Sequence, residues 1–242
     1  MQVEVYPTDA DAVEAAAALV AERIREAVVR GRARVALGGG RSSRAMLVTL
    51  ASRGDLPWGH VDWCLADERC GEPGDTLAHA KVARDSLFGP RGVAASHIRG
   101  PVVGDRPDEV ATRYAESLSE VLGSGGRFDL VVLGIGSDAA LGVLTPGCAA
   151  LESTALVAVV GAAGAAEPPR VSLTPRALAS AAYVIVTAVG PESAGAVASA
   201  LRDGTGPAGC VLPSERVTWI VDRAAASQLL ATAIPVDGTP AP

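Results

Sequence analysis

Residues 128–147 read FDLVVLGIGSDAALGVLTPG, an apolar run that leads directly into a glycine-rich turn. The run from Phe128 to Leu133 predicts a buried strand, because near-continuous apolar residues are typical of strands that are covered on both faces. Residues 134–138, GIGSD, predict a loop whose backbone can approach a ligand closely. The stretch therefore predicts a parallel sheet with a functional loop after one of its strands.

Strand and helix patterns alternate along the rest of the chain. Further apolar runs predict strands at residues 3–6, 34–37, 61–66, 155–160, 183–189 and 217–221. Apolar residues at helical spacing predict helices at residues 9–29, 43–52, 76–87, 107–122, 175–181, 192–201 and 224–231. This order indicates the α/β class, with a mostly parallel, doubly wound sheet and helices on both faces. We expect one domain over 1–242, with a frayed tail at 237–242.

Composition excludes several classes of function. Apolar residues make up 49% of the chain but aromatic residues only 3%, so the core must consist mainly of Ala, Val and Leu. The net charge of −6 and the lack of a basic stripe argue against nucleic acid as a partner. No run of about 18 apolar residues predicts a membrane span. Cys64 lies in an apolar run and is expected to be a buried hydrophobe. With no signal peptide, we expect a cytoplasmic protein.

Four segments are expected to carry the chemistry, because ligands of open α/β sheets bind beyond the carboxyl ends of the strands. The first is residues 38–44, GGGRSSR. Its glycines allow the backbone to approach a ligand closely, and amides at the start of the following helix can hold an anion. The alternative is a tight turn with a serine cap. The candidate ligand-binding residues are Gly39, Gly40, Arg41, Ser42 and Arg44.

The second segment holds acidic and basic side chains side by side, and the fourth holds a single arginine. Asp67-Glu68-Arg69 follows the predicted strand 61–66, where a carboxylate beside a guanidinium can orient a polyol. A solvated ion pair is the alternative. Residues 168–174, PPRVSLT, place Arg170 in a loop with an edge strand. The third segment is 134–147. His79 is either a solvated residue or an acid or base, since histidine titrates near neutrality.

These segments together resemble the 6-phosphogluconolactonase family. Residues 67–69 match that family's Asp-Glu-Arg signature, whereas the related glucosamine-phosphate isomerases usually show Asp-Glu-Tyr. Residues 38–44 resemble its Gly-Gly-Ser-Thr-Pro-Arg loop, and residues 168–174 its Pro-x-Arg-Ile-Thr-Leu-Thr segment. The resemblance implies the fold, lactone hydrolysis without a metal or organic cofactor, and a phosphate-binding role for Arg170.

The sequence departs from this family at functional positions. The family's glycine loop continues Asp-Gly-His-Thr, and its histidine is the general base. Here Ala140 stands at that position and cannot accept a proton. General base catalysis typically contributes a factor of about 10²–10⁴ in rate. In addition, Ser193 replaces a lysine that helps to hold phosphate, and Ala78-His79-Ala80 replaces Ser-Asn-Tyr.

We therefore expect one pocket between residues 39–44, 67–69, 138–141 and 170. Asp138, His79 and Asp67 are the candidate catalytic residues, with Asp138 or His79 positioning water. Arg69 and Arg170 would hold the ligand's oxygens. The leading hypothesis is an enzyme acting on a sugar lactone, a sugar phosphate or a related small polar metabolite. The alternatives are an enzyme redirected to a less charged substrate, and a non-catalytic binding or partner protein.

Overall fold

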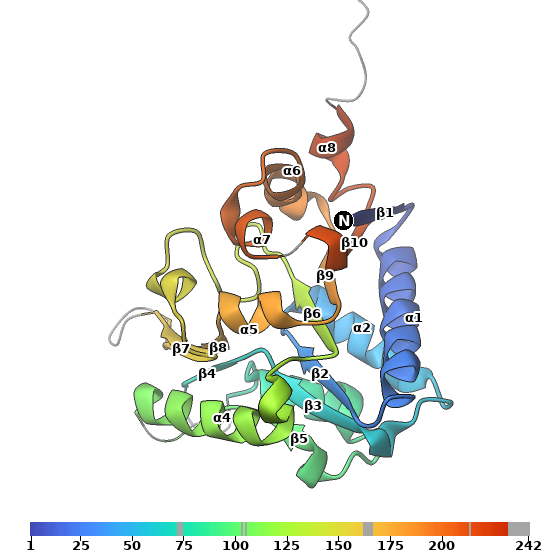
Figure 1. Ribbon diagram of the computed structural model, residues 1–242. Helices are drawn as coiled ribbons and strands as arrows, with labels where there is room; N and C mark the ends of the chain where they lie inside the picture. Colours follow the sequence, from blue (N-terminus) through green and yellow to red (C-terminus); the bar gives the residue numbers. More distant parts are fainter. Residues whose placement is uncertain (72–74, 103, 105, 162–166, 213, 232–242) are drawn as a thin grey trace, which may run out of the picture.

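The computed structural model describes residues 1–71, 75–102, 104, 106–161, 167–212 and 214–231. Seven strands form one sheet in the order β1-β10-β9-β6-β2-β3-β5, and every neighbouring pair is parallel (Figure 1). This confirms the predicted sheet. Its strands are β1 Gln2–Tyr6, β2 Ala33–Leu37, β3 Val61–Leu65, β5 Ile98–Arg99, β6 Leu130–Gly134, β9 Val184–Ala188 and β10 Val217–Asp222.

Helices cover both faces of this sheet, as predicted. Val35 of β2 packs in one core with α1 and α2, while its neighbour Ala36 packs in the other core with α4. Successive strand residues point to opposite faces, so a strand covered on both sides must be apolar throughout. The α-helices are α1 Asp9–Val28, α2 Arg41–Ser52, α3 His79–Ala83, α4 Pro107–Leu122, α5 Pro175–Ser180, α6 Ala194–Arg202, α7 Gly206–Val211 and α8 Ser227–Ala231.

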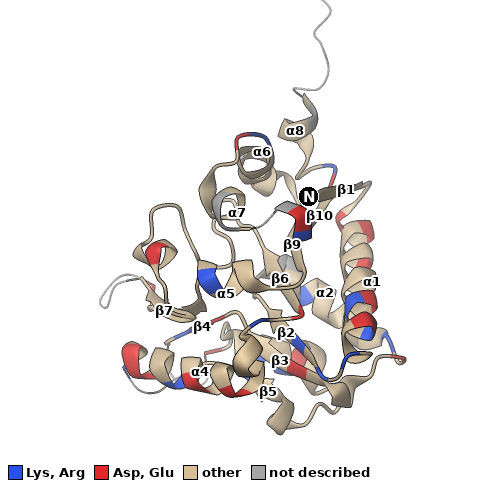
Figure 2. Cartoon of the chain, in the orientation of Figure 1, with Lys and Arg blue, Asp and Glu red and all other residues tan. Residues whose placement is uncertain are grey.

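Local chemistry explains where the long helices begin. The hydroxyl of Thr8 accepts a hydrogen bond from the amide of Asp11 at 3.1 Å, which caps α1. Pro107 starts α4, and the left-handed Gly123 ends it. Both helices confirm the predicted bounds to within one residue. Figure 2 shows acidic and basic residues on α1 and α4, whereas β6 and β9 carry almost no charge. The described helices include none that is long and apolar enough to cross a bilayer.

A second sheet contains residues 67–69, for which the sequence predicted no strand. It has three antiparallel strands in the order β4-β8-β7, with bounds β4 Asp67–Arg69, β7 Val157–Val160 and β8 Arg170–Leu173. Asp67 pairs with Ser172, and Arg69 pairs with Arg170. Three charged residues are too few to show the alternation of apolar and polar side chains that predicts a strand. Residues 67–69 form a strand because they pair with β8.

Smaller differences concern helix bounds. The helix predicted from residue 76 begins only at His79 and continues as a π-helical turn at Arg84–Phe88. The helix predicted from residue 192 begins at Ala194, after a 3₁₀ turn at Pro191–Ser193. Helix α7 was not predicted, because its glycine and proline favour a loop. The expected tail at 237–242 lies outside the described residues. Cys64 is fully buried, and burial raises the pKa of its thiol to about 12.

Candidate functional site

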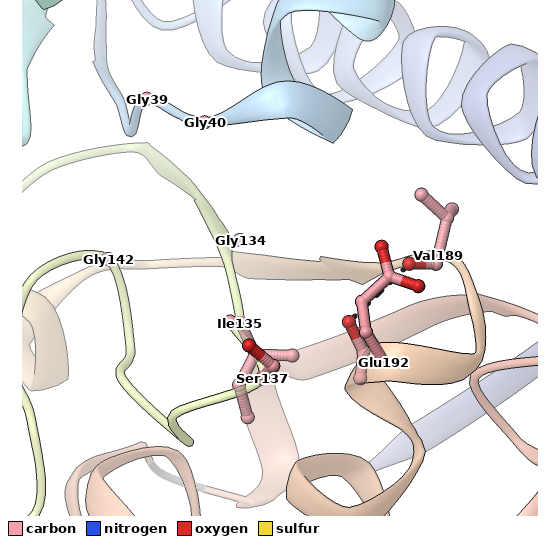
Figure 3. Close-up of a pocket in the computed structure, with 10 residues that line it drawn as sticks. Gly39, Gly40, Gly134, Ile135, Ser137, Gly142, Val189 and Glu192 are labelled. Carbon is pink, nitrogen blue, oxygen red and sulfur yellow. Dashed lines mark hydrogen bonds between the residues drawn. The ribbon is translucent and has the colours of Figure 1, made fainter.

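A cavity of about 250 Å³ lies at the carboxyl ends of the adjacent strands β2, β6 and β9 (Figure 3). From β2 the chain continues toward β3 and β5, whereas from β6 it continues toward β9 and β10 on the other side. The connections therefore diverge here, which is where open α/β sheets bind ligands. The cavity is lined by Gly39, Gly40, Gly134, Ile135, Gly136, Ser137, Gly142, Val189, Glu192 and Ser193.

The loop between β2 and α2 lies close to a side chain from another element, His79 of α3. A Cβ atom at Gly39 would lie 1.9 Å from Nε2 of His79, so only glycine fits against this imidazole. The Ser43 hydroxyl donates to the Gly39 carbonyl at 2.9 Å and steadies the loop. Arg44 is exposed and is not among the residues lining the cavity. The side chains of Arg41 and Ser42 lie outside the described part of the chain.

Three of the predicted site residues, Asp67, His79 and Arg170, meet beside this loop. Asp67 Oδ2 accepts hydrogen bonds from Arg170 Nε at 3.1 Å and Nη2 at 2.5 Å, and lies 3.0 Å from His79 Nδ1. His79 Nε2 lies 3.0 Å from Arg170 Nη2. Because a guanidinium only donates, Nε2 must accept and the ring proton must lie on Nδ1. The alternative of a solvated His79 is wrong, since its side chain is only 15% exposed.

Asp67 is an ionised carboxylate inside the protein, with 1% of its surface exposed. Burial raises the pKa of this carboxyl, but the hydrogen bond from His79 and the charge and hydrogen bonds of Arg170 outweigh burial and hold the pKa below its usual value. Its other oxygen, Oδ1, has no hydrogen-bond partner among the described residues. The carboxylate therefore orients the imidazole and the guanidinium through Oδ2, while Oδ1 can still accept a hydrogen bond.

Glu68 is a positioning residue that the sequence did not single out. Its buried carboxylate accepts hydrogen bonds from the backbone amides of Arg69 at 2.7 Å, His79 at 2.9 Å and Ala80 at 2.7 Å. These bonds satisfy amides at the start of α3, which would otherwise lack partners. Glu68 thereby holds the backbone of His79 in place. Glu68 lies 11 residues before His79 in the chain, so no local sequence pattern could predict this contact.

Arg69 does not join the Asp67 cluster. Its Nε lies 3.3 Å from Oδ2 of Asp75, and its Nη2 lies 3.3 Å from Oε2 of Glu167. Both partners carry the opposite charge. Although Arg69 and Arg170 are directly paired across β4 and β8, their side chains meet different carboxylates. The described contacts of Arg69 are therefore structural ion pairs.

The glycine loop after β6 places Asp138 and Ala140 outside the cavity lining. Asp138 is exposed, and its Oδ1 accepts a hydrogen bond from the amide of Ala140 at 3.1 Å. This bond closes a turn in which Ala139 has a φ of 59°. Ala140 itself is 4% exposed. Asp138 thus has a structural role in the described turn.

The expectation of one pocket between all four segments needs correction. The cavity joins the two glycine loops to residues 189–193, a segment that sequence analysis assigned only the loss of a lysine. Asp67, His79 and Arg170 form a separate cluster, because β4 and β8 pair in their own sheet. Gly39 is the shared element: it lines the cavity and contacts His79. Glu192 is a lining residue that sequence analysis missed.

Comparisons with known proteins agree with this architecture. The family model described as glucosamine-6-phosphate isomerases/6-phosphogluconolactonase matches residues 7–219. A 6-phosphogluconolactonase of Streptomyces coelicolor is 33% identical over 236 residues, covering 89% of this chain and 90% of that relative.

Two solved structures are also similar. One, a devB protein, has a TM-score of 0.82 at 25% identity and covers 94% of this chain and 99% of its own. The 6-phosphogluconolactonase of Trypanosoma brucei has a TM-score of 0.79 at 22% identity, covering 94% and 98%, and supports the fold. Since the family model spans most of the sequence, the chain belongs to the glucosamine-6-phosphate isomerase/6-phosphogluconolactonase family.

Proposed function

We propose that this protein hydrolyses a sugar lactone bound in the cavity between β2, β6 and β9. The observation that supports this most directly is the position of the cavity at the divergence of the sheet, between two glycine loops. Backbone amides of such loops can stabilise the oxyanion that forms when water attacks a carbonyl. The Streptomyces coelicolor relative carries the name of a lactonase, which agrees with this reaction.

His79 is the proposed proton acceptor for the attacking water. Ala140 has no basic group, and Asp138 is engaged in its own turn. Asp67 holds the proton of His79 on Nδ1, which leaves the lone pair on Nε2. This is the arrangement in which a carboxylate orients an imidazole for general base catalysis. The same imidazole lies against Gly39, at the edge of the cavity.

Arg170 is the proposed switch between the resting and the working site. In the structure its Nη2 donates to His79 Nε2 at 3.0 Å, so the lone pair is occupied. A ligand oxygen that accepts a hydrogen bond from Nη2 would release Nε2 for water. Arg170 would then hold the ligand, as the family resemblance implies, and the released imidazole would take the proton.

The same contact supports a second candidate function. If Arg170 never leaves His79, both ring nitrogens stay occupied and the protein binds a small polar molecule without converting it. Whether the protein is an enzyme or a binding protein therefore depends on whether the hydrogen bond between Arg170 Nη2 and His79 Nε2 breaks when a ligand binds.

A lactonase assay distinguishes these functions. The purified full-length protein is added to glucono-1,5-lactone and to its 6-phosphate, and ring opening is measured after subtraction of spontaneous hydrolysis. We expect saturable turnover above the spontaneous rate for at least one lactone. If neither is hydrolysed while either stabilises the protein against heat, the binding function is favoured, since a ligand of the native state raises Tm.

A further inference from the structure

We propose that Asp222 is a positioning residue for ligand binding, because its carboxylate fixes the turn that forms one wall of the cavity. The inference rests on the proposed function and adds a strand, β10, whose end lies behind that wall. The described residues that line the cavity lie at the ends of β2, β6 and β9. Asp222 is the last residue of β10, the neighbour of β9, and only 5% of its surface is exposed.

The wall consists of residues 189–193, which follow β9. Val189, Glu192 and Ser193 line the cavity, and Figure 3 shows the side chains of Val189 and Glu192 beside each other. Gly190 has a φ of 86°, a backbone conformation that favours glycine, and its carbonyl accepts a hydrogen bond from the amide of Ser193 at 3.2 Å. The Glu192 carboxylate packs over Gly190, since a Cβ atom there would lie 2.5 Å from Oε2. The backbone at Gly190 therefore sets the position of the lining residues on both sides of it.

Asp222 holds this backbone from the neighbouring strand. Its Oδ1 accepts a hydrogen bond from the amide of Gly190 at 3.1 Å and another from the amide of Ala225 at 2.8 Å. Ala225 is fully buried and belongs to a hydrophobic core. One carboxylate oxygen thus ties the cavity wall to a turn that is packed in the core. Without this acceptor the Gly190 amide loses its partner, and the turn is free to shift.

An ordered wall affects ligand binding more than proton transfer. A wall that is mobile in the free protein must be ordered when the ligand binds, and the free energy of that ordering weakens the affinity. His79, the proposed proton acceptor, is held instead by Asp67 and Glu68. Loss of the Asp222 carboxylate should therefore raise KM and leave kcat nearly unchanged.

The test measures kcat and KM of full-length variants with glucono-1,5-lactone and with its 6-phosphate. Asp222→Ala should raise KM about tenfold, which corresponds to about 1.4 kcal/mol, and change kcat by less than about twofold. Asp222→Asn removes the charge but keeps an oxygen that can accept both amides, so its KM should stay close to that of the unmodified protein. Asp129→Ala is the matched control and should leave KM unchanged. The carboxylate of Asp129 also accepts a backbone amide, that of Arg34 at 2.9 Å, but at the amino ends of β2 and β6.

Three results would overturn the proposal. One is an unchanged KM in folded Asp222→Ala, and another is a fall in kcat as large as the rise in KM. The third is a KM in Asp222→Asn as high as in Asp222→Ala, because charge and not the hydrogen bonds would then be responsible. If Asp222→Ala does not fold, hydrogen exchange in the unmodified protein and in Asp222→Asn decides. Protection of the Gly190 amide in both supports the proposal, and an unprotected Gly190 amide contradicts it.

Failure of the proposed function gives a different result. If the unmodified protein hydrolyses neither lactone, the Kd for gluconate and 6-phosphogluconate, the stable ring-opened acids, is measured by calorimetry in place of KM. An increase in Kd of about tenfold in Asp222→Ala but not in Asp222→Asn supports the role of Asp222. An unchanged Kd, or no binding of either acid to the unmodified protein, contradicts it.

Discussion

At the scale of single residues, Gly39 links the cavity to the Asp67 cluster. Gly39→Ala places a methyl group 1.9 Å from His79 Nε2, so the imidazole must leave its contacts with Asp67 and Arg170. Overpacking of this kind costs about 1–3 kcal/mol. We expect a loss of that size in the free energy of unfolding, measured by urea denaturation. Gly59→Ala is the control, because open space surrounds Gly59; equal stability of both variants would contradict the contact.

Asp67 gives a prediction about acid stability. Its folded pKa is depressed below the ordinary value of about 3.9, so it stabilises the fold fully above that pH. The stabilisation is lost as the pH falls through the lower, folded pKa. Replacing the carboxylate by an amide leaves Arg170 without its buried counter-charge, which costs about 3–5 kcal/mol.

Denaturation between pH 7 and pH 2 tests this prediction. Asp67→Asn should unfold more easily at pH 7, and its stability should fall less steeply below pH 4 than that of the unmodified protein. Asp203→Asn is the control: the pKa of Asp203 is also lowered, by Arg202, but this ion pair is on the surface. Identical pH profiles for Asp67→Asn and the unmodified protein would contradict the buried ion pair.

At the scale of elements, the short helix α3 depends on β4. Glu68→Ala removes the acceptor for the amides of His79 and Ala80, and a buried amide without a partner costs about 1–3 kcal/mol. We expect these two amides to exchange hydrogen faster in the variant, by tenfold or more, as measured by NMR. Exchange in α1 should change far less, because it has its own cap at Thr8. Unchanged exchange at residues 79 and 80 would exclude Glu68 as the anchor of α3.

The same elements show how far sequence reasoning reaches. Helices α1 and α4 were predicted to within one residue, because their apolar spacing and their Thr8 and Pro107 starts are local signals. The sheet of β4, β8 and β7 was not, since the Asp67–Arg170 contact joins positions 103 residues apart. In the site, the glycine loops were predicted from their own residues. Glu192 was missed because nothing local indicates that its side chain reaches the cavity.

At the scale of the whole molecule, the parallel sheet sets the position of the chemistry. The ends of β2, β6 and β9 form the cavity, and the second sheet brings Asp67 and Arg170 to the side of the Gly39 loop. The fold is that of the family. The proposed function adds that Ala140 and Ser193 stand where the sequence resemblance places a general base and a phosphate-holding lysine. An unchanged scaffold can host a changed site because function depends on a few side chains placed on it.

The central claim is that the Asp67-oriented imidazole of His79 takes the proton that a histidine at position 140 would take in the family. The most direct test is kcat/KM for lactone hydrolysis in His79→Asn, which introduces the residue that the family resemblance gives for this position. His60→Asn, an exposed histidine, is the control. We predict a loss of about 10²–10⁴ in His79→Asn and no change in His60→Asn. An undiminished rate in folded His79→Asn would contradict the claim.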